Sequence, residues 1–407
     1  MSAKVFSWKV TLFVFCLDWL LMSGSYTLMF PFLPVYLKND LNCPPEDLTF
    51  WSSACFSVQF VFSALLSPFW GRIADRYGRK LMLIRASSML ALSYFICMLV
   101  RTPLELFLAR IFMGFACGIT PVILSMNSDI MPKNKLGFSM GLLQSMNILG
   151  SVIGPLAGGA IAQYLSVRYT FAITTCALSL VTVLSLIFIH EPEQNQKPTA
   201  APAEALKKNG TMAVLKQWPV LFVLITAFAG MMIMMLPVAI LTPFIISLAH
   251  GGSHGILLSG AIFSLYGIAG AITSPFWGTL GQRRGFFRML VIAMFLSAIA
   301  SLLQSVPGSI ATFAVVNFIA GVCLSGIVPM VNSLLVRATA QGGRTAAFGL
   351  LYSFSELGSG SGPAIGGFIS EMAGPRTTFI CAGVMLFIAA VAALKYAPPE
   401  LRGRKGF

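Results

Sequence analysis

The chain has 407 residues, of which 57% are hydrophobic and only 10% are charged. Soluble domains carry about 25% charged residues, so this composition excludes a soluble globular protein and favours a protein embedded in a membrane. The formal net charge of +14 would suit a nucleic-acid binder, but all except five of the 27 Lys and Arg residues lie in segments predicted to face the cytoplasm, where membrane topology accounts for them. We therefore expect no nucleic-acid partner.

Apolar segments long enough to cross a bilayer follow one another along the whole chain. In lipid every backbone polar group must be satisfied within its own segment, so these segments are expected to be α-helices. An even number of spans and a basic N-terminus place both termini in the cytoplasm. The sequence predicts twelve spans, at about residues 10–36, 48–70, 80–100, 104–130, 138–163, 168–190, 218–247, 256–280, 288–306, 309–336, 345–370 and 376–397.

Two internal repeats indicate that the chain consists of two copies of one unit. Ser67–Gly71 reads SPFWG and recurs 207 residues later as Ser274–Gly278. A second pattern, G-x8-G-x3-GP-x2-GG, begins at Gly141 and again at Gly349, at an offset of 208. Each half is therefore expected to contain six helices in the same order, related by an axis along the membrane normal.

The division between the halves is visible in the sequence. Glu191–Lys216 interrupts the apolar pattern with prolines and lysines, which favours a cytoplasmic linker. The fold class follows: an all-α membrane protein with two pseudo-symmetric six-helix bundles, residues 1–190 and 217–407, joined by the linker at 191–216. Since the cysteines lie mostly in apolar segments without a CxxC pair and there are only three histidines, we expect no disulfide, metal or cofactor.

The stretch Gly71–Leu83, GRIADRYGRKLML, is basic and lies between two apolar segments. We expect it to be a charged hairpin loop in water on the cytoplasmic side. Asp75 ends the second segment, where a carboxylate can face the free N–H groups of a neighbouring helix. Arg79 is expected to pair with Asp129, the acid at the cytoplasmic end of the fourth segment. These contacts predict a gate, formed by Gly71, Asp75, Arg76, Gly78, Arg79, Lys80 and Asp129.

The glycines of the second repeat predict close helix packing. Glycines four residues apart leave a smooth face on a helix, against which another helix can approach closely. Pro155 and Pro363 are expected to bend their helices, since proline removes a backbone hydrogen bond. We expect this packing to serve the interface between the halves. The residues concerned are Gly150, Gly154, Pro155, Gly158, Gly358, Gly362, Pro363 and Gly366.

Three ionisable residues fall deep inside predicted spans: Asp18, Arg110 and Glu356. A charge at such a depth costs several kcal/mol unless it is paired or hydrated, so these side chains are expected to face a cavity. A carboxyl group removed from water binds its proton more tightly, which suits proton exchange. We predict Glu356 as the proton-coupling residue, with Asp18 as the second candidate; Asp18 as an interfacial acid and Arg110 as a structural anchor remain alternatives.

Polar, aromatic and methionine side chains in otherwise apolar spans are candidates for a substrate cavity. Methionine and aromatic residues make an adaptable apolar surface that suits varied lipophilic ligands, although each residue taken singly also fits ordinary helix packing. The candidates are Tyr26, Gln59, Asn127, Gln144, Asn147, Met231, Met235, Tyr266, Asn317 and Tyr352.

Several of these patterns together resemble those of the major facilitator superfamily. Gly71-x3-Asp75-Arg76-x-Gly78-Arg79-Lys80 is similar to the family's signature between helices two and three, and Arg110-x3-Gly114-x3-Gly118 resembles its helix-four motif. The GP-x2-GG pattern resembles the helix-five motif of drug:proton antiporters. In the second half Gln282 stands where Asp75 does, and Asn317 where Arg110 does, so the charged pattern belongs to the first half.

The resemblance implies a bacterial inner-membrane exporter that moves small lipophilic or amphipathic compounds against protons by alternating access, and that Asp75 faces helix eleven. We expect its partners to be a small-molecule substrate, protons and the lipid bilayer, and the protein to be a monomer and not an enzyme. Two alternatives within the fold remain: an exporter of one metabolite or siderophore, and a proton symporter for uptake. A membrane enzyme or receptor has no supporting motif in the sequence.

Overall fold

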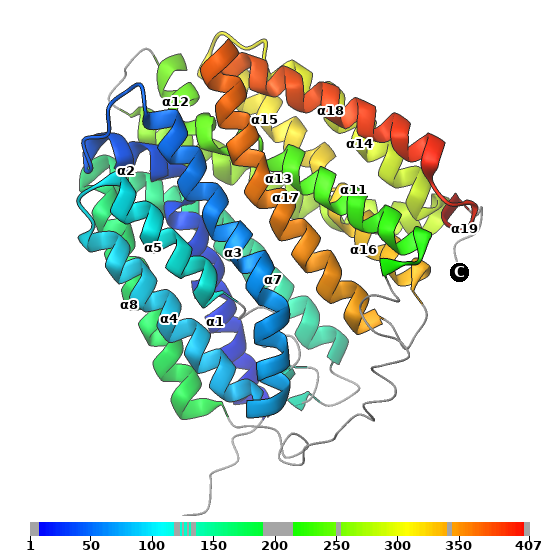
Figure 1. The fold of residues 1–407 in the computed structure, drawn as a ribbon, viewed down its shortest axis with the longest axis horizontal. Coiled ribbons are helices and arrows are strands. Elements are labelled where there is room, and N and C mark those ends of the chain that lie inside the picture. The colour runs from blue at the N-terminus through cyan, green and yellow to red at the C-terminus, as the bar shows by residue number, and fades with distance from the viewer. Residues whose placement is uncertain are drawn as a thin grey trace, which may run out of the picture.

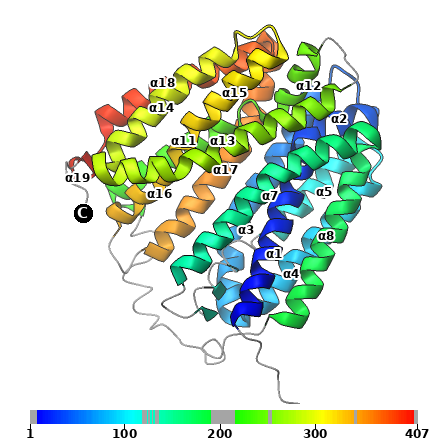
Figure 2. The same cartoon turned by 180° about the vertical axis from the view of Figure 1, so that it is seen from behind.

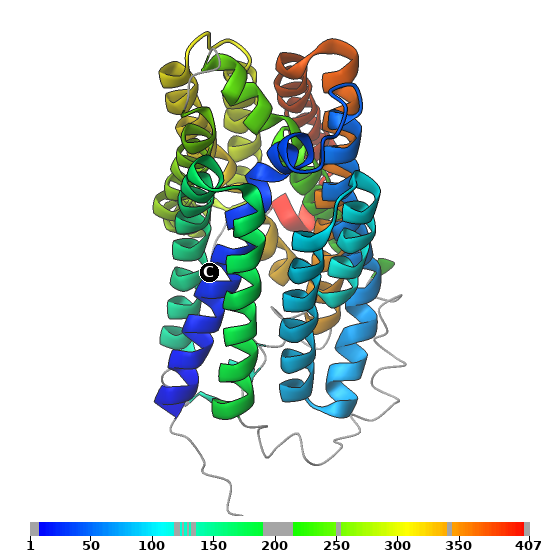
Figure 3. The ribbon, with the colours of Figure 1, turned by 90° about the vertical axis from the view of Figure 1, so that its left-hand side faces the viewer.

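The computed structural model describes residues 8–117, 123, 126–127, 130–131, 136–189, 215–249, 254–339 and 344–402, and every regular element in these ranges is helical. Of the predicted linker at 191–216, only the last two residues lie within them. The helices run between two faces of the molecule (Figure 3). We call the face at which the described chain starts, at Trp8, and ends, at Arg402, the inner face, and the opposite one the outer face.

The first half consists of a long bundle with one kinked entry helix. Its first span is built from α1, a short 3-10 turn η1 and α2, because Pro31 and Pro34 interrupt regular helix geometry there. The elements of this half are α1 (Trp8–Met29), η1 (Phe30–Phe32), α2 (Leu33–Asn39), α3 (Leu48–Tyr77), α4 (Arg79–Leu99), α5 (Pro103–Ala116), α7 (Leu136–Tyr164) and α8 (Val167–Phe188).

The second half repeats this order. Its first span is likewise broken, by Pro237 between α11 and α12. Ten helical spans in the described ranges are long and apolar enough to cross a membrane. The elements are α11 (Trp218–Met235), α12 (Val238–Leu248), α13 (Gly255–Arg284), α14 (Phe286–Gln304), α15 (Ile310–Leu324), α16 (Ile327–Ala338), α17 (Arg344–Ala373), α18 (Pro375–Tyr396) and α19 (Pro399–Arg402).

The prediction of a charged hairpin loop after residue 70 is wrong. Helix α3 continues through the charged residues to Tyr77, and α4 begins at Arg79, so Gly78 alone makes the turn. Its φ of +97° is open to glycine and strained for other residues. Gly285, with φ +95°, makes the equivalent turn between α13 and α14. Hydrophobicity marks where the membrane ends, whereas the helix ends only where the backbone must reverse.

A tryptophan holds a helix break in each half. Helix α5 ends at Ala116, and the indole Nε1 of Trp70 donates a hydrogen bond to the carbonyl of Phe115 at 3.0 Å. In the second half Trp277 Nε1 donates to the carbonyl of Val322 at 2.8 Å, just before the interruption between α15 and α16. These tryptophans belong to the repeated SPFWG motif, which therefore satisfies carbonyls that the broken helices leave free.

Each half packs its own glycines against its own first span. A Cβ atom on Gly150 would lie 2.7 Å from the carbonyl oxygen of Leu20 in α1, and one on Gly158 would overlap the carbonyl of Leu28. On α17, the equivalent glycines meet α11, where a Cβ on Gly366 would overlap the carbonyl of Leu236. The prediction of packing across the two halves is therefore wrong for Gly150, Gly154, Gly158, Gly358, Gly362 and Gly366, which hold α7 to α1 and α17 to α11. The last glycine of each repeated motif does face the other half: a Cβ on Gly159 would lie 3.4 Å from Gly260, and one on Gly367 would overlap Ser53.

The interface between the halves uses the four longest helices. Helix α3 packs against α17, and α7 against α13 (Figures 1 and 2). Other small residues make this contact: a Cβ on Gly360 would lie 3.0 Å from the carbonyl of Ser57, and Ser264 donates a hydrogen bond of 2.7 Å to the carbonyl of Val152.

The two halves are joined at the outer side and diverge toward the inner face (Figure 1). At the outer side Thr242 of α12 donates a hydrogen bond of 2.6 Å to the carbonyl of Pro31 in the first half. Nearer the inner face Gly349 of α17 is exposed, and no atom lies within 4 Å of the position of an added Cβ. The interface is thus tight on one side of the membrane and loose on the other.

Candidate functional site

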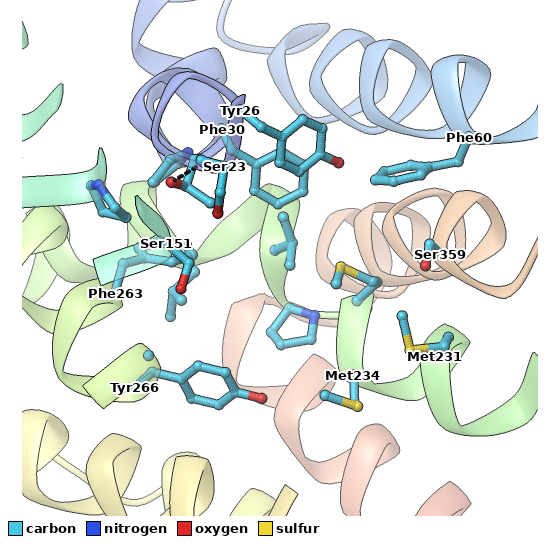
Figure 4. Close-up of a pocket in the computed structure, with 18 of the residues that line it drawn as sticks. Ser23, Tyr26, Phe30, Phe60, Ser151, Met231, Met234, Phe263, Tyr266 and Ser359 are labelled. Atoms are coloured by element: carbon cyan, nitrogen blue, oxygen red, sulfur yellow. Dashed lines mark hydrogen bonds between the residues drawn. The ribbon is translucent and has the colours of Figure 1, made fainter. Parts of the chain in front are cut away.

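A cavity of about 610 Å³ lies between the two halves. Aromatic and methionine side chains are prominent in its walls (Figure 4). The first half contributes an aromatic cluster, in which the ring centroids of Tyr26 and Phe30 lie 5.3 Å apart and those of Phe30 and Phe60 lie 6.3 Å apart. The second half contributes methionines from α11, among them Met231 and Met234. The lining is mostly apolar, so a lipophilic molecule that enters it loses contact with water.

Most of the predicted substrate-lining residues meet at this cavity. They come from both halves and from helices that are far apart in the sequence, and the fold brings these helices together around the cavity. Those that line it are Tyr26, Gln59, Asn147, Met231, Met235, Tyr266, Asn317 and Tyr352.

Two predicted lining residues lie elsewhere. Asn127 is fully buried, and its Nδ2 donates a hydrogen bond of 2.9 Å to Ser139 Oγ, so it joins its own segment to α7. Gln144 is exposed and is not part of the cavity wall. Both predictions failed for one reason: polarity within an apolar span does not tell which way the helix turns a side chain.

Glu356 lies in the cavity wall, on the face of α17 that is turned away from α11. The hydroxyl groups of Ser63 in α3 and of Tyr352, one turn earlier on α17, lie near its carboxyl group. Ser63 belongs to the other half, so this proximity spans the interface. Among the described residues that line the cavity, Glu356 is the one carboxylate, and no Lys or Arg accompanies it.

Arg110 is only 2% exposed and does not reach the cavity wall itself. Its Nη1 donates to Gln59 Oε1 at 2.9 Å, and its Nη2 lies 2.8 Å from the sulfur of Met29. In the described part of the chain no carboxylate forms an ion pair with it. A buried cation without an anion relies on hydrogen bonds and the surrounding dipoles, and here Gln59 connects it to the cavity.

Asp18 lies outside the cavity. It is fully buried between α1 and α8, where Ser185 Oγ donates a hydrogen bond of 3.0 Å to Oδ2. Its Oδ1 has no hydrogen-bond partner in the described ranges. The expectation that Asp18 faces a cavity is therefore wrong, because α1 turns this residue toward its neighbour in the same bundle.

The predicted gating residues fall at the inner end of α3 and the start of α4. Lys80 donates a hydrogen bond of 3.0 Å to the carbonyl of Leu186, which ties α4 to α8. The pairing of Arg79 with Asp129 stays a prediction. So does the contact of Asp75, at the inner end of α3, with the eleventh span, which is α17 in the structure. Some of the predicted residues fall outside the part of the chain whose side chains the structure describes. They are Gly71, Asp75, Arg76, Asp129 and, from the helix-four motif, Gly118.

The model of the Major Facilitator Superfamily matches the chain over residues 16–303 and 251–407. The chain belongs to the major facilitator superfamily. Curated relatives agree. The chain is 30% identical over 385 residues to a protein of Rahnella sp. (strain Y9602) and 31% identical over 385 residues to one of Salmonella arizonae, both named multidrug resistance protein MdtG. These alignments cover 94% of this chain and 92% and 94% of the relatives.

Solved structures of superfamily transporters share the fold. A crystal structure of a mutant of the nucleoside transporter NupG matches with a TM-score of 0.79 at 15% identity, covering 96% of this chain and 100% of that one. A bacterial homologue of the human lysosomal transporter Spinster, in an inward-facing and unoccupied conformation, matches with a TM-score of 0.78 at 16% identity, covering 99% of each chain. The superfamily identifies the protein as a membrane transporter.

Among the residues of the site that were not predicted are three polar ones: Ser63, Ser359 and Gln304. Ser63 was passed over because serine is common in membrane helices, and nothing in the sequence says that it faces Glu356. Ser359 lines the cavity (Figure 4) beside the glycines of α17. Gln304 lines the cavity from the end of α14. A long polar side chain at the end of an apolar span is the sequence feature that could have identified it.

Proposed function

We propose that this transporter exports small lipophilic or amphipathic compounds in exchange for protons, by alternating access of the central cavity. The observation that carries the proposal is the cavity itself: an apolar chamber between two pseudo-symmetric halves, with one carboxylate, Glu356, at their interface. The curated relatives named multidrug resistance proteins support a broad range of cargo.

The walls of the cavity suit cargo of varied shape. Methionine side chains are unbranched and polarisable, so Met231, Met234 and Met235 can repack around different molecules. The rings of Tyr26 and Phe60 offer flat faces on the opposite side. A cavity with this lining does not select for one shape, which favours several lipophilic substrates over one specific metabolite.

Glu356 is the residue that we propose to carry the proton. An ionised carboxylate accepts hydrogen bonds only, whereas a protonated one also donates, so a change of protonation alters how Glu356 interacts with the nearby Ser63 hydroxyl of the other half. In this way the charge state of the cavity acts on the contact between α3 and α17. Entry of one proton down a potential of 100 mV supplies about 2.3 kcal/mol, enough to concentrate an uncharged compound about 50-fold.

Asp18 and Arg110 do not line the cavity, so we propose no direct role in proton exchange at the cavity for either. We propose that Arg110 acts on the cavity through Gln59, with which it is hydrogen bonded. Asp18 is fully buried outside the cavity wall, which makes it the weaker candidate as a proton carrier.

The test is transport in proteoliposomes with an imposed pH gradient and a fluorescent lipophilic cation as cargo. We expect the gradient to drive transport in the unaltered protein, Glu356→Gln to abolish this dependence, and Ser63→Ala to weaken it. Glu371→Gln is the matched control, because Glu371 lies on the same helix but is exposed. Full coupling in Glu356→Gln would refute the assignment of the proton site.

We also propose the orientation and the location. The inner face is taken as the cytoplasmic side of a bacterial inner membrane, because basic residues such as Arg283, Arg284 and Arg337 lie near it. Opening of this face requires the predicted contacts of Asp75 and Arg79 to break.

Reporter enzymes fused to the two termini test the orientation. Reporter activity on the outer side of the membrane would contradict it. The mass of the purified protein tests whether it is a monomer.

A further inference from the structure

The hydrogen bond from Arg110 fixes the orientation of an amide in the cavity wall. A guanidinium group can only donate, so the atom of Gln59 that lies 2.9 Å from Arg110 Nη1 must be its carbonyl oxygen, Oε1. The amide nitrogen, Nε2, is then turned away from Arg110. Gln59 is part of the cavity wall, and in the described ranges Nε2 has no protein partner and is not a buried unsatisfied atom. The first half therefore presents N–H donors to the cavity.

The second half fixes another amide with the opposite orientation. Asn317, which occupies the repeat position of Arg110, donates from Nδ2 to the backbone carbonyl of Ile262 at 3.1 Å. A backbone carbonyl can only accept, so the Oδ1 atom of Asn317 is left as an acceptor. Gln304 Nε2 donates to this Oδ1 at 2.9 Å. The remaining polar atom of Gln304 is Oε1, an acceptor, which has no partner in the described part of the chain.

We propose that Gln59 and Gln304 select cargo by hydrogen bonds of opposite polarity. Gln59, positioned by Arg110, binds an acceptor group of the cargo, such as a carbonyl, nitro or sulfonyl oxygen. Gln304, positioned by Asn317, binds a donor group, such as an amine, ammonium or hydroxyl. The inference rests on the proposed function, and it deepens it by naming the substrate class: amphipathic molecules that carry an acceptor and a donor on an otherwise apolar body.

The two amides are selective because neither can adapt by rotating. Reversing the Gln59 amide would turn its N–H groups toward Arg110, where two donors would face each other and a buried cation would lose its acceptor. Reversing Gln304 would place two oxygens together at Asn317. The positioning residues therefore convert amides, which can otherwise donate or accept, into groups of one kind.

The experiment measures binding of three pyrene compounds to the purified protein in nanodiscs by fluorescence. The compounds share one apolar body: 1-ethylpyrene has no polar group, 1-acetylpyrene has one acceptor, and 1-pyrenemethylamine has a cationic donor. Gln59→Met is expected to weaken binding of acetylpyrene about fivefold, in line with the loss of one hydrogen bond, while ethylpyrene binding stays unchanged. Gln304→Met is expected to weaken binding of the amine by a similar factor.

Gln59→Glu gives the sharpest outcome. The glutamate keeps the bond with Arg110 but replaces the donor by a second acceptor. We expect it to weaken acetylpyrene binding and to strengthen binding of the amine, which reverses the preference of the site. A structural role alone would not produce a reversal. Arg110→Met releases the amide, so the preference for acetylpyrene over ethylpyrene should shrink even where ethylpyrene still binds.

Two results would overturn the inference: equal loss of all three compounds in Gln59→Met, which indicates a packing defect, or no change in any of them. Gln144→Met is the matched control, since Gln144 lies outside the cavity wall, and it should bind like the unaltered protein. Because binding requires neither a proton gradient nor transport, loss of proton coupling leaves this result intact. Failure of all three compounds to bind the unaltered protein would instead overturn the proposed function and this inference with it.

Discussion

For the glycines that hold α7 to α1 and α17 to α11, we predict that substitution by alanine destabilises the protein. Gly158→Ala adds a methyl group that overlaps the carbonyl of Leu28, and Gly366→Ala does the same at Leu236. Forcing an extra methyl group into a tight contact costs about 1–3 kcal/mol, and the higher helix propensity of alanine returns about 0.5–1 kcal/mol. We therefore expect each variant to lose about 1–2 kcal/mol.

The control lies on the same helix as Gly366. A methyl group on Gly349 meets no atom within 4 Å, so Gly349→Ala keeps the propensity gain of about 0.5–1 kcal/mol without the clash. The assay is thermal unfolding in detergent, where about 2–4 °C corresponds to each kcal/mol for domains of this size. We expect Gly158→Ala and Gly366→Ala to melt several degrees lower, and Gly349→Ala slightly higher. Equal melting temperatures for all three would refute the claim that backbone contact, and not helix propensity, sets these positions.

Three further changes test single bonds. Trp277→Phe removes the indole donor at the break before α16 and should destabilise the protein by about 1–3 kcal/mol, measured by the same melting assay, with Trp70→Phe expected to behave alike. Thr242→Val keeps the shape of the side chain but loses the bond to Pro31; spin-label distances across the outer side should lengthen on average, and an unchanged distribution would count against a role in closure. Asp18→Asn keeps an acceptor for Ser185, so we expect transport with intact pH dependence; complete loss of coupling would instead make Asp18 a proton carrier.

The arrangement of spans could be predicted from sequence, because hydrophobic length and repeated motifs report it directly. Periodicity placed Tyr352 and Glu356 on one face of their helix, and the structure keeps them together at the cavity. The turn at Gly78 could not be placed, because charge marks the edge of the membrane and not the end of a helix. The breaks after Ala116 and Leu324 also escaped prediction, although Pro121 and Pro329 each stand five residues beyond the break in the sequence.

The direction in which side chains point was the main limit. Sequence shows that Gly154 and Gly158 share a face, but only the assembled bundle shows that this face meets α1 and not the other half. The same limit separates Gln59, which reaches the cavity, from Gln144, which does not. Cross-half partners such as Ser63 and Glu356 are 293 positions apart in the chain, so local patterns carry no information about them.

The one-residue turns at Gly78 and Gly285 have a mechanical consequence. A one-residue connection restricts independent movement of the two helices that it joins. We therefore expect α3 and α4 to move as one unit, and α13 and α14 as another. Helices α3 and α13 pack against the other half, while α4 and α14 expose apolar side chains such as Leu92 and Ile299 on the outside of the bundle. Lateral pressure in the bilayer would therefore be transmitted through α4 and α14 to the helices that form the contact between the halves, and we expect transport to depend on the thickness of the lipid bilayer.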